Sequence, residues 1–291
     1  MSNPFDLTDT ETYLRWRERK LAHAIVDTDE LIVEVKNPNA ITAVEHAELL
    51  SCCRRSNMVI YATRAEMDEL SLQRFAAQLG LTHLDANWLA GEQGITRITV
   101  CHDDGQRQAY IPYTDRAIKW HTDGYYNPPE RQIRGMVLHC AQSAGVGGEN
   151  RVMDHEIAYL MLRDANAEFI RALSAPDAMT IPERVDATDG VRPAQTGPVF
   201  SVNPASGALH MRYTARTRSI EWKQDEITRA AVAQLEQLLA TQTPHIHSLR
   251  MEQGMGLLCN NVLHDRTAFT DDPAKPRLLY RARYLDRLTV S

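Results

Sequence analysis

The first third of the chain alternates between helical and extended hydrophobic patterns. Apolar residues recur with helical spacing in three segments, and Gly80 follows the third as a stop signal. The predicted helices span residues 10–25, 42–53 and 66–79. Between the last two, residues 58–61 (MVIY) form a short apolar run of the kind found in buried strands. This part of the chain therefore predicts helices packed around a strand.

From residue 95 onward the pattern changes to many short extended runs. Strands are predicted at residues 95–100, 107–113, 134–140, 198–202, 208–213, 248–252, 257–263 and 277–285. Turn signals lie at residues 103–105 (DDG) and 203–207 (NPASG). Helical periodicity returns at residues 156–163, 165–173 and 225–240.

This order of elements predicts an α+β fold. Many short strands with late pairing are typical of a jelly-roll core, here with flanking and inserted helices. No repeat, low-complexity tract or long linker divides the sequence, so residues 1–291 are expected to form a single domain. Residues 1–57 are expected to be a helical N-terminal part packed on that core.

Composition narrows the class of protein. The net charge is -6 and no long basic run occurs, which argues against a nucleic-acid partner. No apolar stretch approaches the roughly 18 residues of a membrane span, and the first residues lack an apolar signal core. The five cysteines are odd in number and have no metal-binding spacing. We therefore expect reduced thiols, no membrane segment and a cytoplasmic location.

The strongest chemical signal is the segment 119–127, KWHTDGYYN. His121 and Asp123 are separated by one residue, and residues i and i+2 of an extended chain point to the same side. One imidazole and one carboxylate can therefore reach one metal ion from a short segment. Two neutral nitrogens and one carboxylate on one face of a metal are the ligands of iron(II) oxygenases. A second histidine is then expected elsewhere.

Two other histidine segments compete with this pair. Residues 102–104 (HDD) repeat the His-x-Asp spacing, but they lie in the predicted turn at Gly105, where these residue types have an ordinary structural role. His245 and His247 could share a strand face, but they lie in a polar connection after a helix. His121 is distinguished by its aromatic neighbours and by partners further along the chain.

The downstream partner is His264, which follows an apolar run and precedes a polar turn. The end of a strand can hold a metal ligand rigidly and still expose it to a substrate. Taken alone, however, a histidine in this position is more often a structural residue.

The last predicted strand has an arginine face. With a period of two, Arg277, Leu279, Arg281 and Arg283 share one side, and the other side is apolar. Buried guanidinium groups need anionic partners, and a dicarboxylate such as 2-oxoglutarate would provide one with matching geometry. An edge strand with solvated arginines explains the pattern equally well.

Together these segments resemble the taurine dioxygenase family of iron(II)/2-oxoglutarate-dependent oxygenases, which includes γ-butyrobetaine hydroxylase. Residues 121–123 (HTD) match the family's His-x-Asp, and residues 263–269 (LHDRTAF) resemble its His-x-Arg-Thr-Ala-Phe segment. The resemblance extends from about residue 58 to the C-terminus. It implies a double-stranded β-helix fold and an iron(II) ion bound by His121, Asp123 and His264.

The resemblance also implies the reaction and the cosubstrate site. Iron(II), 2-oxoglutarate and O2 would oxidise a C–H bond of a small polar molecule and release succinate and CO2. Because halogenating relatives lack the carboxylate, Asp123 implies hydroxylation or a related oxidation. Arg277 would bind the far carboxylate of 2-oxoglutarate, and Arg281 its C1 carboxylate or a substrate anion. Residues 147–150 (GGEN) resemble the family's Gly-Gly-x-Thr segment, with Asn150 in the place of the threonine.

The expected substrate side is less sharply defined. Tyr125, Tyr126 and Asn127 directly follow the first ligands, and Arg218 lies in a segment (RTRSI) that resembles one near the family's substrate pocket. Aromatic faces would favour a polar or cationic molecule, whereas Arg281 would favour an anion. Ordinary packing also explains the tyrosines. The chain lacks the cysteine-rich zinc domain of γ-butyrobetaine hydroxylase.

Two other classes remain open from the sequence. One is a catalytically silent jelly-roll sensor that binds metal and 2-oxoglutarate. The other is a hydrolytic zinc enzyme with the same three ligands. Relatives of the resembled family are often dimers or tetramers, so a homo-oligomer is expected.

Overall fold

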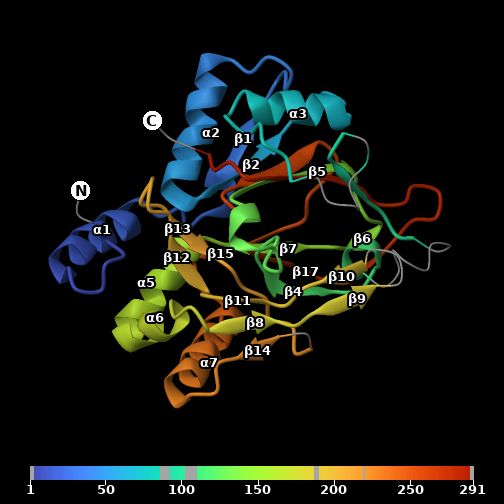
Figure 1. The fold of residues 1–291 in the computed structure, drawn as a ribbon. Helices are drawn as coiled ribbons and strands as arrows, with labels where there is room; N and C mark the ends of the chain where they lie inside the picture. Colours follow the sequence, from blue (N-terminus) through green and yellow to red (C-terminus); the bar gives the residue numbers. More distant parts are fainter. Residues whose placement is uncertain are drawn as a thin grey trace.

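The computed structural model describes residues 3–85, 91, 93–101, 110–186, 190–218 and 220–288 (Figure 1). Two sheets form the centre of the molecule, and β1 runs parallel to β2 at the edge of the larger one. In sheet order, the six-stranded sheet contains β1 (Ile32–Glu34), β2 (Met58–Ala62), β16 (Met255–Cys259), β5 (Gly135–Gln142), β19 (Leu278–Tyr284) and β3 (Thr96–Ile98). The four-stranded sheet contains β15 (Ile246–Leu249), β7 (Asn150–Met153), β17 (Leu263–Arg266) and β4 (Ile118–His121).

The helices and four small sheets surround these two sheets. The helices are α1 (Thr10–His23), α2 (Ala43–Ser56), α3 (Glu69–Ala77), α5 (His155–Ala165), α6 (Ala167–Leu173) and α7 (Glu226–Ala240), with short 3-10 turns η1 (Thr28–Leu31), η2 (Ile111–Tyr113) and η3 (Pro129–Arg131). The small sheets pair β11 (Gln195–Gly197), β8 (Met179–Ile181) and β14 (Glu221–Trp222); β9 (Arg184–Asp186) and β10 (Gly190–Arg192); β12 (Phe200–Val202) and β13 (Leu209–Met211); β18 (Phe269–Thr270) and β6 (Val146–Gly147).

Local sequence explains where the helices begin. Each starts after a residue whose side chain accepts a hydrogen bond from a free backbone N–H in the first turn. These N-cap residues are Asp9, Thr42, Asp68, Asp154, Asn166 and Asp225. In α2, Thr42 and Glu45 form a complete capping box. The polar residue before each helical pattern therefore sets the position at which the helix begins.

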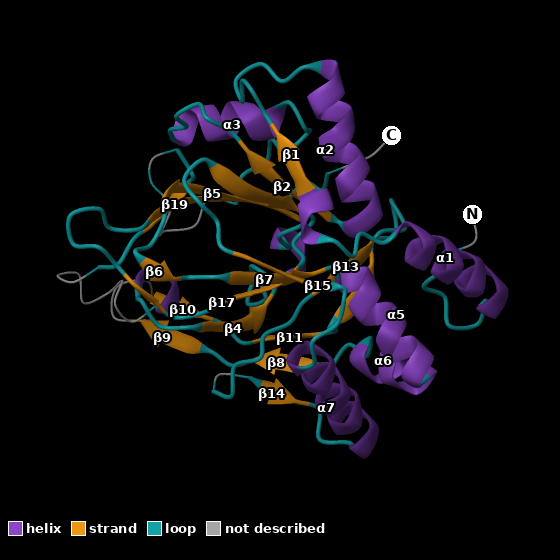
Figure 2. Cartoon of the chain, turned by 180° about the vertical axis from the view of Figure 1, so that it is seen from behind, coloured by secondary structure: helices purple, strands orange, loops and turns teal. Residues whose placement is uncertain are grey.

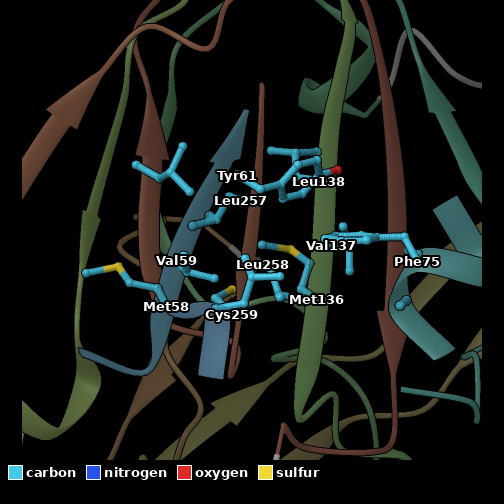
Figure 3. Close-up of a cluster of buried hydrophobic side chains, with 14 of the residues drawn as sticks. Met58, Val59, Tyr61, Phe75, Met136, Val137, Leu138, Leu257, Leu258 and Cys259 are labelled. Carbon is cyan, nitrogen blue, oxygen red and sulfur yellow. The ribbon is translucent and has the colours of Figure 1, made fainter. Parts of the chain in front are cut away.

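The larger core lies on the outer side of the six-stranded sheet. Figure 1 shows α2 and α3 over β1, β2 and β5. Phe75 of α3 is fully buried against the sheet, and Tyr61 of β2 lies 4.7 Å from it, measured between ring centroids. Figure 3 shows the side chains of β2, β5 and β16 that fill this layer, among them Val59, Val137 and Leu258. Burial of this apolar layer holds the N-terminal elements on the sheet.

The second core joins the four-stranded sheet to the other helices. Leu263 of β17 and Trp120 of β4 pack with apolar residues of α5, α6 and α7. Figure 2 shows these helices grouped on the side of β8 and β13. The two sheets thus have separate apolar cores on their outer sides, and the space between them is lined by strands of both.

The mixed helix-and-sheet class predicted from the sequence is confirmed. The helices predicted at 10–25, 42–53, 66–79, 156–163, 165–173 and 225–240 all form, with ends shifted by a few residues. The turn at 203–207 joins β12 and β13, where Asn203 Oδ1 accepts hydrogen bonds from the backbone N–H groups of Ala205 and Ser206. No helix in the described ranges is long and apolar enough to cross a membrane.

Three local predictions are wrong. Residues 111–113 form the 3-10 turn η2 and not a strand, because Pro112 has a fixed φ and no N–H to donate. The strand predicted at 257–263 is two strands, since Asn261 has a φ of 52° and interrupts the extended chain. His247 lies in strand β15 and not in a polar connection. The predicted turn at 103–105 lies outside the described residues.

Candidate metal centre

His121 and His264 face each other across an antiparallel strand pair. β4 ends at His121, and its direct partner in the register of β17 is His264. The two ring centroids are 4.2 Å apart. Figure 2 shows β4, β7 and β17 as neighbours in one sheet. His264 is the second residue of β17, so it lies near the start of a strand and not at its end as expected.

Asp123 joins the histidines from the turn that follows β4. Its Oδ1 atom lies 3.8 Å from Nε2 of His121. One nitrogen or oxygen of each of the three residues lies within 4.8 Å of the others, and no other such group occurs among the described residues. His245 and His247 are therefore outside it, whereas the competing segment at His102 is not described.

Both histidine rings are oriented by the same backbone contact. Nδ1 of His121 lies 2.9 Å from the Lys119 carbonyl oxygen, and Nδ1 of His264 lies 2.9 Å from the Val262 carbonyl oxygen. A carbonyl oxygen only accepts hydrogen bonds, so each Nδ1 carries the proton. The lone pair of each neutral ring is then on Nε2, the atom available to a metal.

Charge and burial favour the protonation states that a metal requires. Burial lowers the pKa of His121 to about 3, and the nearby His264 adds to this effect. Burial opposes ionisation of Asp123, but the guanidinium groups of Arg281 and Arg283 outweigh it and hold the carboxyl pKa below its ordinary value. At neutral pH the group therefore presents a neutral His121 beside a carboxylate.

The carboxylate of Asp123 has an unused oxygen. Oδ1 lies 3.3 Å from Nη1 of Arg281. Oδ2 is fully buried and has no hydrogen-bond partner in the described structure. A buried carboxylate oxygen without a partner costs free energy unless a cation or donor is supplied. Two imidazole nitrogens and this oxygen form a donor set that fits a divalent transition metal.

A cavity between the two sheets adjoins this group. It is lined by both histidines and by Arg277, Leu279 and Arg281 of the last strand segment. These residues alternate along the chain, which agrees with the predicted arginine face. The opposite face, including Tyr280 and Tyr284, packs in the larger core. A bulge at residues 278–279 leaves this alternation intact at Arg281.

Arg277 is a buried cation in this cavity. Its side chain is 4% exposed, and its guanidinium carbon lies 5.0 Å from the centroid of the Phe269 ring. Burial lowers the pKa of Arg277. Among the described residues no carboxylate forms an ion pair with it. The cavity thus contains a desolvated positive charge that an anionic ligand would neutralise.

Arg283 differs from Arg277 because the protein supplies its anion. Its guanidinium donates to a carboxylate oxygen of Asp85 and, over 2.8 Å, to the hydroxyl of Tyr126. Asp85 is 2% exposed and also binds Arg131. Asp85 had no role in the sequence interpretation, because it lies in no motif and reaches Arg283 only through the tertiary fold.

Asn150 lies where the resemblance expects a cosubstrate ligand. Its Nδ2 donates to the Asp265 carbonyl oxygen over 3.0 Å, while Oδ1 is buried without a partner in the described structure. The side chain also lines the cavity. The glycines before it have a structural explanation of their own, since a Cβ at Gly147 would lie 2.5 Å from the Ala268 carbonyl oxygen.

None of the four expected substrate residues lines this cavity. Tyr125 is buried and lies under the guanidinium of Arg216, 5.8 Å from its ring centroid. Tyr126 accepts the hydrogen bond from Arg283, and Asn127 donates to the Arg131 carbonyl oxygen. Arg218 is exposed to solvent, and its substrate role stays a prediction.

Comparison with known proteins places this chain in a family of oxidative enzymes. Residues 33–283 match the family described as "Taurine catabolism dioxygenase TauD, TfdA family". The match contains the strands of His121 and His264 and the arginines at 277, 281 and 283. The chain therefore belongs to this family.

Solved structures of similar fold include three oxygenases. Asparagine oxygenase in complex with Fe(II), 2S,3S-3-hydroxyasparagine and succinate is 16% identical with a TM-score of 0.61, covering 98% of this chain and 86% of that one. A point mutant of OrfP, a non-heme iron oxygenase, in complex with (3S)-hydroxy-L-Arg is 16% identical with a TM-score of 0.61, covering 84% and 80%. A putative alpha-ketoglutarate-dependent taurine dioxygenase from Burkholderia xenovorans is 17% identical with a TM-score of 0.58, covering 87% and 88%. At these identities the similarity shows a shared fold.

Family membership confirms the class expected from the resemblance. The protein is an iron(II)- and 2-oxoglutarate-dependent dioxygenase, an oxidoreductase that uses O2. Membership of this family also favours an active enzyme over the catalytically silent sensor, and a dioxygenase over the hydrolytic zinc enzyme. The roles of individual residues are a separate question.

Proposed function

We propose that His121, Asp123 and His264 bind the iron(II) ion of this dioxygenase. The supporting observation is the convergence of their ligand atoms within 4.8 Å. The Nδ1 hydrogen bonds keep both Nε2 lone pairs available, and the unpartnered Oδ2 of Asp123 gives the third donor. The bound metal would supply the means to activate O2.

Arg277 is the anchor for 2-oxoglutarate. Its charge is buried, has no carboxylate partner in the described structure and lies in the same cavity as the two histidines. A carboxylate would form a charge-assisted, two-pronged hydrogen bond with the guanidinium. Asn150 lines the same cavity and would assist the cosubstrate through the second proton of its Nδ2, and Arg281 adds positive charge beside Asp123.

The primary substrate is a small polar molecule with an anionic group, and amino acids are the leading candidates. The guanidinium of Arg216 lies beside Tyr125, and this cation favours an anionic group such as a carboxylate on the substrate. Two solved structures of similar fold contain hydroxylated amino acids, 2S,3S-3-hydroxyasparagine and (3S)-hydroxy-L-Arg. With Asp123 as a ligand, the product is a hydroxylated or otherwise oxidised C–H position. Tyr125, Tyr126, Asn127 and Arg218 are the proposed substrate contacts.

The metal assignment is tested by replacing Asp123 with Ala. The variant should lose iron(II) binding and 2-oxoglutarate-dependent succinate formation, because only two imidazoles remain. Asp177, which is exposed and pairs with Lys223, offers the matched control, and Asp177→Ala should behave as the wild type. Unchanged iron binding and turnover in Asp123→Ala would show that the carboxylate is not a ligand.

A substrate screen identifies the molecule that is oxidised. Succinate formation should be measured with amino acids, sulfonates, betaines and small carboxylates, and true substrates should couple succinate to a product heavier by one oxygen. Stimulation by none of the amino acids would contradict the leading candidate class.

We also propose that residues 1–291 form one double-stranded β-helix domain in the cytoplasm. The two central sheets that enclose the cavity support the jelly-roll assignment. The five cysteines are all free thiols, which supports a reducing compartment. A homo-oligomer, dimer or tetramer, stays a prediction that light scattering during gel filtration would test.

A further inference from the structure

The turn between β16 and β17 contains an asparagine in an unusual backbone conformation. Asn261 has a φ of 52°, a value that L-residues other than Asn and Asp rarely adopt. It is 2% exposed and lies three residues before His264. A residue held in this region inside a buried turn is a candidate for a functional constraint.

The side chain of Asn261 binds both backbone groups of Asp123. Its Oδ1 accepts a hydrogen bond from the Asp123 N–H at 2.7 Å, and its Nδ2 donates to the Asp123 carbonyl oxygen at 2.9 Å. The second proton of Nδ2 goes to the Ile133 carbonyl oxygen at 2.7 Å. Both donors of the amide are therefore used, and the opposite orientation of the amide would leave N–H facing N–H.

Asp123 has no neighbouring strand to supply these bonds. β4 ends two residues earlier at His121, so the backbone of Asp123 would otherwise be buried without partners. The amide of Asn261 takes the place of the missing strand. The next residue after Asp123, Gly124, has a φ of 66°. A Cβ at this position would lie 2.4 Å from Cγ1 of Ile133, so the chain directly after Asp123 has no room for a side chain.

The short turn that contains Asn261 and Val262 therefore binds two of the three proposed metal ligands. Asn261 holds the backbone of Asp123, and one residue later the Val262 carbonyl oxygen holds Nδ1 of His264. Asn260, in turn, fixes the turn to the rest of the protein by donating from Nδ2 to Oδ1 of Asn57 over 3.1 Å. Asp123 and His264 are far apart in sequence, and this turn sets their relative position directly.

We propose that Asn261 is a positioning residue that fixes the Asp123 carboxylate against His264 and thereby sets the affinity of the metal centre. The proposal rests on the proposed ligand set. Asn261 does not touch the metal site itself; it acts through the backbone of Asp123. Hydrogen-bond partners of metal ligands typically change metal affinity by about 10- to 100-fold when they are removed.

The test replaces Asn261 with Gly. Glycine adopts a positive φ without strain, so Asn261→Gly keeps the turn and removes only the amide. The control is Asn203, whose Oδ1 accepts hydrogen bonds from the backbone N–H groups of Ala205 and Ser206 in the turn between β12 and β13, away from Asp123. Mn(II) affinity is measured by titration and folding stability by urea unfolding, on the full chain without turnover.

Asn261→Gly should weaken Mn(II) binding by about 10- to 100-fold. Asn203→Gly should leave Mn(II) affinity within about twofold of wild type, because its hydrogen bonds reach neither a proposed ligand nor the turn that holds Asp123. Should Asn261→Gly fail to fold, Asn261→Asp tolerates the same φ, keeps the acceptor for the Asp123 N–H and loses both donors, so it should also bind Mn(II) more weakly.

Wild-type affinity in a folded Asn261→Gly or Asn261→Asp protein would overturn the positioning role, as would an equal loss of affinity in Asn203→Gly. A wild-type protein that binds no Mn(II) or iron(II) would instead refute the proposed ligand set, so the two failures are distinguishable.

Discussion

At the scale of single residues, both histidines of the site are oriented by a backbone contact of one ring nitrogen. Each histidine uses Nδ1 to donate to the carbonyl oxygen two residues earlier, which leaves Nε2 for another partner. Arg277 differs from them, because its guanidinium contacts the Phe269 ring and forms no ion pair with a described carboxylate. An unneutralised buried cation is the feature that most directly requires an anionic ligand.

Replacement of Arg277 with Met should raise the KM for 2-oxoglutarate and leave the metal bound. Loss of a charge-assisted pair at a buried site removes about 2–3 kcal/mol, which corresponds to roughly a 30- to 150-fold increase. The affinity for 2-oxoglutarate is measured by calorimetry with Mn(II) in place of iron. Arg171→Met, at an exposed ion pair on α6, is the control. An unchanged affinity in Arg277→Met would place the cosubstrate anchor elsewhere.

The residues that could be predicted from the sequence are those with a local pattern. His121 and Asp123 are close in the chain, and the alternation of Arg277, Leu279 and Arg281 reports which side of a strand faces inward. Asp85 and Asn261 have no such pattern, since their partners are brought to them only by the tertiary fold. The site could therefore be predicted where the chain is extended and periodic.

At the scale of elements, the two strands that carry the histidines of the site are joined on both faces. His121 and His264 share the inner face, while on the other side Arg151 of β7 pairs with Asp265 and lies over the Trp120 ring, 5.0 Å from its centroid. Trp120 and Asp265 are each adjacent in sequence to a histidine of the site, and Arg151 lies in β7, the other neighbour of β17. The register of β4, β7 and β17 is thus fixed beside the ligands.

Apolar patterning predicts the elements better than their interruptions. The run 257–263 is continuously apolar except for two asparagines, and it predicts one strand. The structure has two, because Asn261 takes a left-handed conformation that its hydrogen bonds with Asp123 support. The pair of asparagines inside the apolar run is the feature of the sequence that could have indicated this interruption. Hydrophobic periodicity carries no information about such a turn.

The turn before β7 should be intolerant of a side chain. A Cβ at Gly147 would meet the Ala268 carbonyl oxygen at 2.5 Å, and its φ is 76°. Gly207 has a φ of 69° with no atom within 4 Å of the added Cβ. A substitution there therefore measures only the free-energy cost of placing a side chain on a backbone with positive φ. Gly207→Ala should cost about 1–2 kcal/mol of unfolding free energy, and Gly147→Ala clearly more. Equal losses in urea unfolding would show that the contact with Ala268 is relieved cheaply.

At the scale of the whole molecule, stability should depend on keeping buried histidines neutral. His139 of β5 is 2% exposed, contacts the Tyr61 hydroxyl at 3.1 Å and lies between the rings of Tyr61 and Tyr280. Burial lowers its pKa to about 4. Since the unfolded chain binds this proton more readily, its contribution is present above pH 6.5 and is lost as the pH falls towards 4.

Unfolding free energy should therefore decrease on acidification, and His139 should account for about 2 kcal/mol of the loss between pH 7 and pH 5. His139→Gln, which can still bond the Tyr61 hydroxyl, should remove that share of the pH dependence. The matched control is His23→Gln on the exposed side of α1. Urea unfolding at pH 7 and at pH 5 measures this change in unfolding free energy. An unaltered pH dependence in His139→Gln would show that another group is responsible.

The proposed function requires one site that holds iron(II) through His121, Asp123 and His264 and holds 2-oxoglutarate beside it. Anaerobic addition of iron(II) and 2-oxoglutarate to the purified chain should produce a metal-to-ligand charge-transfer band in the visible spectrum. The band should be absent with zinc(II) and absent in His264→Ala. A wild-type protein that binds both components without this band, or a His264→Ala protein that retains it at full intensity, would contradict the account.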